Sequence, residues 1–369
     1  MFLGVRRTII RLRNAVRPMR DRGLDLASIA LLHLPAATFL RAWQRLARPL
    51  NGGRLQAINE RRFSAFAAGL PDDGRPRFYV IVMPNVLHFL LPCVALLERD
   101  ARVVLLVNGA HRWERSFLAA HLGGLPCFRL WTLPLSSAEH GHVISMLLRN
   151  NPGSFGIVDH DCYVFDRGLF GKLAFPAKES LLGLFQESRA ADGFTYPLTF
   201  FLFFNAEILR SVMARHGIDA RLYRTMPPQV TATSRRAGLA PANPWKSHHS
   251  FFDTLHVLLA AALADGHEFR FLSSQLPQPA MHIGGTSIGS HHTKDLFNKY
   301  VTLRFLEFLG NPLLSRRYAF LTAPLRTSQE VLRAFAPSHP VWRALPVIDT
   351  LIRRLHEDLG HGKCAGSGP

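Results

Sequence analysis

The sequence has few cysteines, few charged residues and no long apolar run. Its four cysteines (Cys93, Cys127, Cys162 and Cys364) form no CxxC pair and no spacing typical of a secreted disulfide framework. Three lie in or beside apolar runs, so we expect buried free thiols in a reducing cytosol. The longest apolar stretch, 26–40, contains a serine, a histidine and a proline. A membrane span needs about 20 mostly apolar residues, so we expect a cytoplasmic protein without a transmembrane helix.

Three common motifs are also absent. The chain contains no GxxxxGK[ST], no GxGxxG after its first predicted strand and no GxSxG. These absences count against P-loop, Rossmann dinucleotide-binding and serine hydrolase sites. The composition, 48% hydrophobic and 19% charged, is sufficient for a sizeable core and argues against disorder over most of the chain.

The charge that is present is mostly positive, with a formal net charge of +18. The first 62 residues hold 13 arginines and three acidic residues. On a helix, residues 1–22 would place arginines beside an apolar face, which suits peripheral contact with an anionic membrane at its inner face. A solvated basic helix packed on the main domain is the alternative. Because the basic density lies in this arm and the phenylalanines lie in core-like runs, we expect no nucleic-acid partner. A basic nucleic-acid-binding or membrane-binding protein without catalysis stays as the alternative function.

The pattern of apolar runs predicts three regions. Residues 1–70 read as a basic helical extension, 77–290 as a catalytic domain and 291–369 as a helical carboxyl-terminal region. Between 78 and 158, apolar runs typical of strands alternate with helical patterns, which predicts an α/β fold with a central, mostly parallel sheet. The predicted strands are 78–83, 102–107, 127–133, 155–158, 198–204 and 268–272. The predicted helices include 205–216, capped by Asn205, and 251–264, whereas 226–247 reads as a loop.

Two carboxylates one residue apart follow the fourth predicted strand. In an extended segment Asp159 and Asp161 project to the same side, because side-chain direction repeats every two residues. In an open α/β sheet the ligand site lies beyond the carboxyl ends of the strands. Two hard oxygen donors there can share Mn²⁺ or Mg²⁺, which neutralises a diphosphate. The alternative is that both residues cap a turn and bind nothing.

Polar residues also follow the first two predicted strands. Pro84 and Asn85 end the first strand, with His88 one turn later, and Asn108 ends the second. At this edge of the sheet we expect them to contact a nucleotide, and the alternative is two ordinary turns.

Two later positions complete the set of candidates. His282 precedes Gly284 and Gly285, whose missing side chains let backbone approach phosphate oxygens while the imidazole completes a metal site. A surface histidine in a loop is the alternative. Asp253, at a predicted helix start, either caps that helix or acts as a general base.

Over 77–290 these features resemble the GT-A-fold glycosyltransferases. The resemblance depends on the D-x-D after a strand, the apolar strand before Asn205, the helix-start Asp253 and the late His282. It implies a nucleotide-sugar donor, with Asp159 at the ribose, and Asp161 and His282 at a metal. It further implies Asp253 as the catalytic base of an inverting enzyme, although the Glu-Asp pair often seen there is missing.

The resemblance implies a metal-dependent glycosyltransferase that moves a sugar from a nucleotide-diphosphate donor to an acceptor hydroxyl. The acceptor would be a glycan or a lipid-linked sugar, as in the synthesis of cell-surface glycans or glycolipids. A metal phosphohydrolase built on His160 and Asp161 ranks lower, because such pairs usually lie on helices.

Overall fold

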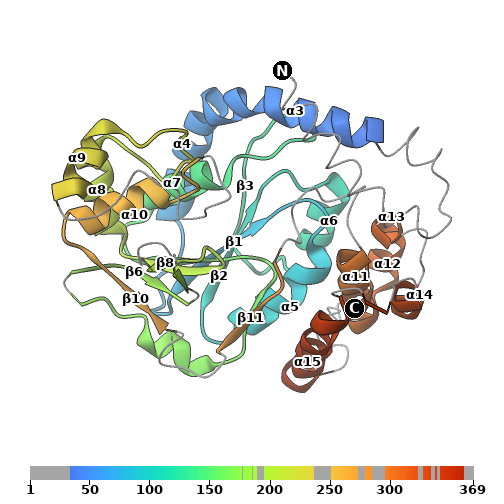
Figure 1. The fold of residues 1–369 in the computed structure, drawn as a ribbon. Coiled ribbons are helices and arrows are strands. Elements are labelled where there is room, and N and C mark those ends of the chain that lie inside the picture. Colours follow the sequence, from blue (N-terminus) through green and yellow to red (C-terminus); the bar gives the residue numbers. More distant parts are fainter. Residues whose placement is uncertain are drawn as a thin grey trace.

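The computed structural model describes residues 34–176, 178–184, 186–188, 195–236, 251–272, 279–284, 296–322, 327–333, 337–338 and 341–360. Within them a seven-stranded sheet has the order β3-β2-β1-β4-β9-β6-β10 (Figure 1). Six strands run in one direction, and β9 runs antiparallel to its neighbours β4 and β6. The expected α/β fold with a mostly parallel central sheet is therefore confirmed. The strands are β1 (Arg77–Val82), β2 (Arg102–Val107), β3 (Cys127–Arg129), β4 (Phe155–Val158), β6 (Glu179–Gly183), β9 (Phe201–Phe204) and β10 (Glu268–Phe271).

Two small antiparallel pairs lie outside this sheet. They are β5 (Cys162–Val164) with β11 (Ala280–His282), and β7 (Gln186–Ser188) with β8 (Thr195–Pro197). The first pair joins the segment after β4 to a segment more than a hundred residues later, and this pairing positions the candidate site.

Helices cover both faces of the sheet because the strands are buried on both. Alternate residues of β1 divide between two apolar clusters: Phe78 and Val80 belong to one, and Tyr79 and Ile81 to the other. The helices of the first face are α5 (Leu87–Leu97) and α6 (Arg112–His121). Those of the second are α4 (Arg54–Ala68), α7 (His140–Asn150), α8 (Ala206–His216) and α10 (His256–Ala264).

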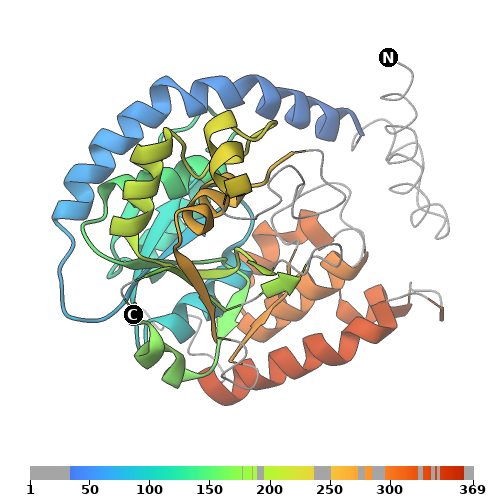
Figure 2. The same cartoon turned by 60° about the vertical axis from the view of Figure 1, so that its left-hand side comes forward.

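The carboxyl-terminal helices form a further layer on α5, at the right of Figure 1. They are α11 (Leu296–Leu309), α12 (Pro312–Arg317), α13 (Ala319–Thr322), α14 (Ser328–Arg333) and α15 (Val341–Leu359). At the other end of the described chain, α3 (Leu34–Gly52) lies across the top of the molecule (Figures 1 and 2). The remaining elements are α9 (Pro228–Arg236) and a 3-10 helix at Arg167–Lys172. No helix of the described residues is long and apolar enough to cross a membrane.

Three predicted elements differ from the structure. Residues 226–247 were predicted as a loop, but α9 occupies part of them, with Pro228 at its first position, where a missing N–H costs nothing. The predicted strand 127–133 ends at Arg129, because the backbone N–H of Trp131 donates to Asn59 Oδ1 (2.7 Å) on α4. Helix 251–264 begins only at His256, because Phe252 pairs with Tyr223 in an extended bridge.

Candidate active site

The two aspartates lie where the sequence predicts, at the carboxyl end of β4. The backbone N–H of Asp159 still donates to Phe200 O (2.9 Å), whereas its carbonyl accepts from the N–H of Cys162 (3.0 Å) in a tight turn. The turn leads into β5, so the chain reverses within three residues. Asp159 is half-buried, and Asp161 is buried.

His282 reaches the aspartates because β11 pairs with β5. His282 lies opposite Cys162 in this pair, next to Asp161. His282 Nε2 is 3.3 Å from Asp161 Oδ1, and the backbone N–H of Gly284 donates to Asp161 Oδ2 (3.2 Å). The ring of His282 also stacks on Phe200, with 3.4 Å between ring centroids. The expected association of Asp159, Asp161, His282 and Gly284 is present, and Gly285 lies outside the described residues.

This cluster has the composition of a divalent metal site. One ligand atom from each of Asp159, Asp161 and His282 can be chosen so that all three lie within 4.8 Å of one another. Two carboxylate oxygens and one imidazole nitrogen suit Mn²⁺ or Mg²⁺, and three protein ligands leave positions for phosphate oxygens. Burial and the neighbouring charge of Asp161 raise the pKa of Asp159 well above its usual range. A bound cation would offset both effects, so the residues fit a metal.

The cysteines near the cluster are not ligands. Cys93 and Cys162 are fully buried free thiols, and burial followed by nearby negative charge raises the pKa of both. The Cys93 thiol donates to the Asp159 carbonyl at 3.6 Å. The Cys93 thiol thus supports the turn. The expectation of buried free cysteines is confirmed at Cys93 and Cys162 and is wrong at Cys127, which is exposed at the edge strand β3.

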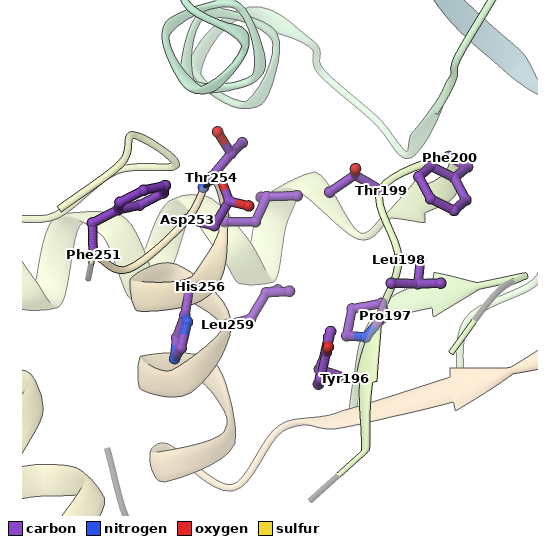
Figure 3. Close-up of a pocket in the computed structure, with 11 residues that line it drawn as sticks. Tyr196, Pro197, Leu198, Thr199, Phe200, Phe251, Asp253, Thr254, His256 and Leu259 are labelled. Atoms are coloured by element: carbon purple, nitrogen blue, oxygen red, sulfur yellow. Dashed lines mark hydrogen bonds between the residues drawn. The ribbon is translucent and has the colours of Figure 1, made fainter. Parts of the chain in front are cut away.

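A pocket adjoins the cluster and contains Asp253 (Figure 3). One wall is residues 196–200, which run from β8 to the residue before β9. The other wall is Phe251, residues 253–256 and Leu259, before and within the first turns of α10. Phe200 belongs to the pocket and also contacts both Asp159 and His282, so the pocket and the metal cluster share a wall. Asp253 lines this pocket together with Phe200.

Asp253 precedes α10 but does not cap it. The N-cap residue is Leu255, which has φ 69°, while Asp253 Oδ1 accepts from the N–H of Thr254 (2.8 Å). The capping alternative for Asp253 is therefore wrong, because the bridge at Phe252 delays the helix. A base role stays a prediction.

His140, which the sequence did not single out, interacts electrostatically with both Asp253 and His160. Burial lowers the pKa of His140, at the start of α7, to about 4, against an opposing effect of Asp253. The charge of His160 also lowers the pKa of His140, so the three side chains are electrostatic neighbours. His140 follows no recognisable motif, and only the fold brings it within electrostatic range of Asp253.

The residues predicted to bind the nucleotide are mostly enclosed. His88 is fully buried and packs against Phe89 and Tyr318, with ring centroids 3.9 and 5.1 Å away. Asn108 is also buried, and its side chain makes two hydrogen bonds to the backbone of Ala138. The side-chain nitrogen of Asn108 donates and its side-chain oxygen accepts, so both atoms hold the turn after β2. This supports the ordinary-turn alternative at that position.

Asn85 lies at the end of β1 in a left-handed conformation, with φ 65°. Its backbone N–H donates to Glu114 Oε1 (2.6 Å), and Pro84 before it is half-buried. Contact of Pro84, Asn85 or His88 with a nucleotide stays a prediction. Glu114, a buried carboxylate that shapes this turn, was not found from the sequence.

Residues 54–209 match the family model described as the StrH glycosyltransferase N-terminal domain. This segment is a glycosyltransferase domain. The match runs from α4 into α8 and contains Asp159 and Asp161, but neither Asp253 nor His282. It confirms the expected resemblance to glycosyltransferases over less than half of the chain.

Solved glycosyltransferases are similar to the chain at low identity. Apo GlyE of Streptococcus pneumoniae TIGR4 is 9% identical with a TM-score of 0.35, and the comparison covers 57% of this chain and 55% of GlyE. Apo WbbM, a bifunctional enzyme, is 12% identical with a TM-score of 0.32, covering 57% and 40%. LgtC, in complex with donor and acceptor sugar analogues, is 12% identical with a TM-score of 0.35, covering 73% and 99%.

The chain thus spans about half the length of GlyE and less than half of WbbM. The assignment of the glycosyltransferase domain depends on the family match. No curated protein matches the sequence.

Proposed function

We propose that the protein is a glycosyltransferase that takes a sugar from a nucleotide-diphosphate donor, with a divalent cation held by Asp159, Asp161 and His282. The convergence of these three side chains carries the proposal, together with the position of Asp159 and Asp161 in the segment that matches a glycosyltransferase domain. When bound, the cation would supply positive charge that stabilises the leaving diphosphate. The N–H of Gly284 and the stacked ring of Phe200 hold Asp161 and His282 in their ligating positions.

We further propose that Asp253 accepts the proton of an acceptor hydroxyl bound in the adjacent pocket. The support is its place in a pocket that shares Phe200 with the metal cluster. The hydroxyl oxygen attacks the anomeric carbon of the sugar as that carbon's bond to the diphosphate oxygen breaks, and the proton moves to the carboxylate. This assignment belongs to an inverting reaction.

Thermal unfolding with UDP-, GDP-, CMP- and dTDP-sugars, each with and without Mn²⁺, tests the donor and the metal together. We expect one nucleotide sugar to raise the melting temperature by several degrees, only with Mn²⁺. Asp161→Asn should abolish that shift, whereas Glu207→Gln, an exposed acid on α8, should keep it. Absence of a shift with every donor, or an unchanged shift in Asp161→Asn, would overturn the proposal.

The base role has a separate test once the donor is known. Asp253→Asn should keep the donor-dependent thermal shift while lowering kcat by about 10²- to 10⁴-fold, the usual range for general base catalysis. A kcat within twofold of the unchanged protein would remove Asp253 from the mechanism.

We also propose a cytoplasmic enzyme that contacts the inner face of an anionic membrane. Residues 1–22, for which the sequence predicts this contact, lie outside the described residues, and we propose that α3 contributes to the same contact. Phe39, Leu46 and Leu50 are 62%, 71% and 53% exposed, and their spacing of seven and four residues gives one stripe along the helix. The exposed Arg45 lies on the same helix. A helix that combines an exposed apolar stripe with basic residues suits an anionic bilayer surface, where a lipid-linked acceptor is available.

Flotation with vesicles of phosphatidylcholine, with or without one third phosphatidylglycerol, tests this contact. We expect binding only to the anionic vesicles, and loss of binding when Phe39, Leu46 and Leu50 are all changed to Ser. Changing the exposed Trp342 and Val347 of α15 to Ser is the matched control and should leave binding intact. Equal binding by both variants would contradict a role for α3.

A further inference from the structure

A second cavity lies at the opposite edge of the sheet from β10, between the end strand β3, its neighbour β2 and helix α6. Its volume is about 280 Å³, and β1 and β2 separate its strand β3 from β4, which leads into the metal cluster. It shares no residue with the Asp253 pocket. The lining residues are Leu105, Val107, Arg115, Leu118, Ala119, Leu122, Gly123, Leu125, Cys127 and Arg129.

The interior of this cavity is aliphatic because of the strand register. Leu105 and Val107 project from β2 toward α6, on the face of the sheet that α5 and α6 cover. On β3, Phe128 belongs to the apolar cluster on the opposite face, because successive side chains of a strand point to opposite faces. Cys127 and Arg129, the neighbours of Phe128, therefore face the cavity. Leu118 and Leu122 of α6 close the opposite wall, so the cavity has room and surface for an apolar chain.

Two guanidinium groups, those of Arg115 and Arg129, lie on the cavity wall. Neither forms an ion pair with an acidic side chain among the residues that the structure describes, although Arg115 Nη1 donates to Ala110 O (2.7 Å). Burial lowers the pKa of Arg115, and so do the charges of Arg129 and Arg112, whereas the charge of Glu114 raises it by a smaller amount. The two guanidinium groups repel each other, so a bound anion that contacts both would be stabilised by their charge.

Glu114 offsets this repulsion only in part. Glu114 precedes Arg115 on α6, but its carboxylate accepts from Asn85 N–H, His111 N–H and the Tyr318 hydroxyl. All three contacts lie within the buried network at the end of β1, and Glu114 itself is fully buried.

We propose that this cavity binds a single-chain amphiphilic anion, with its aliphatic tail against Leu105, Leu118 and Leu122 and its phosphate or carboxylate head on Arg115 and Arg129. The apolar walls match the aliphatic tail, and the two guanidinium groups match the anionic head, because a planar guanidinium pairs with either a phosphate or a carboxylate. A neutral alkyl chain would leave the two positive groups without an anion, and a small anion would leave the apolar walls empty. The site is independent of the proposed transfer reaction.

Cys127 provides a direct readout, because it is exposed on the cavity wall whereas Cys93 and Cys162 are fully buried. In the full-length Cys364→Ser protein, the rate of modification by a maleimide should report on Cys127. We expect dodecyl phosphate or dodecanoate, below its critical micelle concentration, to slow this modification at least tenfold. Protection by only one of the two identifies the preferred head group, and protection by neither overturns the proposal.

Two further probes separate the contributions of tail and head. Dodecanol should protect at least tenfold less than the better anion, and inorganic phosphate should not protect. Equal protection by dodecanol would overturn the role of the arginines, and full protection by inorganic phosphate would overturn the role of the apolar walls.

Arg115→Gln/Arg129→Gln should raise the concentration of the better anion needed for half protection at least tenfold, whereas Arg333→Gln, an exposed arginine of α14, should not. If the double variant does not fold, Arg129→Glu alone provides the test, because the Arg129 side chain is exposed. Unchanged protection in the folded variant would overturn the proposal. Donor-dependent thermal shifts should be unaffected, which distinguishes this result from failure of the proposed transferase function.

Discussion

At the scale of single residues, Gly156 shows how closely the core beneath the candidate site is packed. A Cβ added there would lie 2.0 Å from the ring of Phe78, which also packs on Phe201 and Phe203. The glycine lets an aromatic ring cover β4 three residues before Asp159. The absence of a side chain at Gly156 is a packing requirement.

We therefore expect Gly156→Ala to destabilise the fold by about 3 kcal/mol, the upper part of the usual range for overpacking. Urea unfolding measures the loss, and Phe78→Leu in the same chain should recover part of it. Gly153→Ala, where an added Cβ meets no atom within 4 Å, is the control and should change little. An equal effect at both glycines would show that packing on Phe78 is not the cause.

A second prediction at the residue scale concerns His140 and the dependence of stability on pH. Its pKa is about 4 in the folded protein, against 6.5 for an ordinary imidazole. Between these values the unfolded chain binds a proton that the folded chain does not, so stability falls as the pH falls from about 6.5 to 4. The two pKa values differ by about 2.5 units and one unit is about 1.4 kcal/mol, so we expect His140 to contribute on the order of 3 kcal/mol to that loss.

Urea unfolding of His140→Gln at several pH values should show a shallower decline over this window than the unchanged protein. The control is His267→Gln, a half-buried histidine just beyond the end of α10. Identical pH profiles for the unchanged protein and His140→Gln would refute the prediction.

At the scale of elements, the carboxyl-terminal helices are attached to the sheet domain by a buried polar contact. Tyr318, between α12 and α13, donates its hydroxyl to Glu114 Oε1 (2.7 Å) and accepts from the N–H of Leu87 (3.2 Å). Glu114 also holds the turn at Asn85. A helical layer remote in sequence thus determines the shape of the β1–α5 turn.

Tyr318→Phe should cost about 1–3 kcal/mol, because it leaves the buried Leu87 N–H and one Glu114 oxygen without this partner. Hydrogen exchange should show faster opening at the start of α5 and in α12–α13 than in α8. Tyr300→Phe, which loses a hydrogen bond from Tyr300 to Asp349, is the comparison variant. Unchanged exchange at α5 would contradict the proposed link.

At the scale of the whole molecule, the net charge is the main electrostatic contribution to stability. The chain carries +18 at pH 7, and its ion pairs are mostly at least partly exposed, so they stabilise little. Self-repulsion of a highly charged chain opposes compaction, and salt screens that repulsion over about 10 Å at 0.1 M.

Raising NaCl from 20 to 300 mM at pH 7 should therefore increase the melting temperature by a few degrees. The same series near pH 10, closer to the isoelectric point of about 10.9, should show a smaller increase. A melting temperature that falls with salt at pH 7 would mean that attractive ion pairs outweigh the net repulsion.

Part of this structure was determined by local sequence. β2 and β4 have the predicted boundaries, because each is an uninterrupted apolar run between polar residues, and Asn205 caps α8 through its side chain as predicted. The position of Asp159 and Asp161 just after a strand follows from the same local pattern. Such features depend only on residues that are neighbours in the chain, so they can be predicted from the sequence.

The rest was decided by contacts between distant segments. β6, with a serine and a glycine among its five residues, is a strand because β9 and β10 pair with it on both sides. His282 meets Asp161 only because β11 pairs with β5, and Asp253 reaches the pocket only because Phe252 pairs with Tyr223. Pairing register between remote strands is fixed by the whole fold. For this reason the sequence alone determined the candidate ligands and the core strands, whereas the tertiary structure decided which ligands meet.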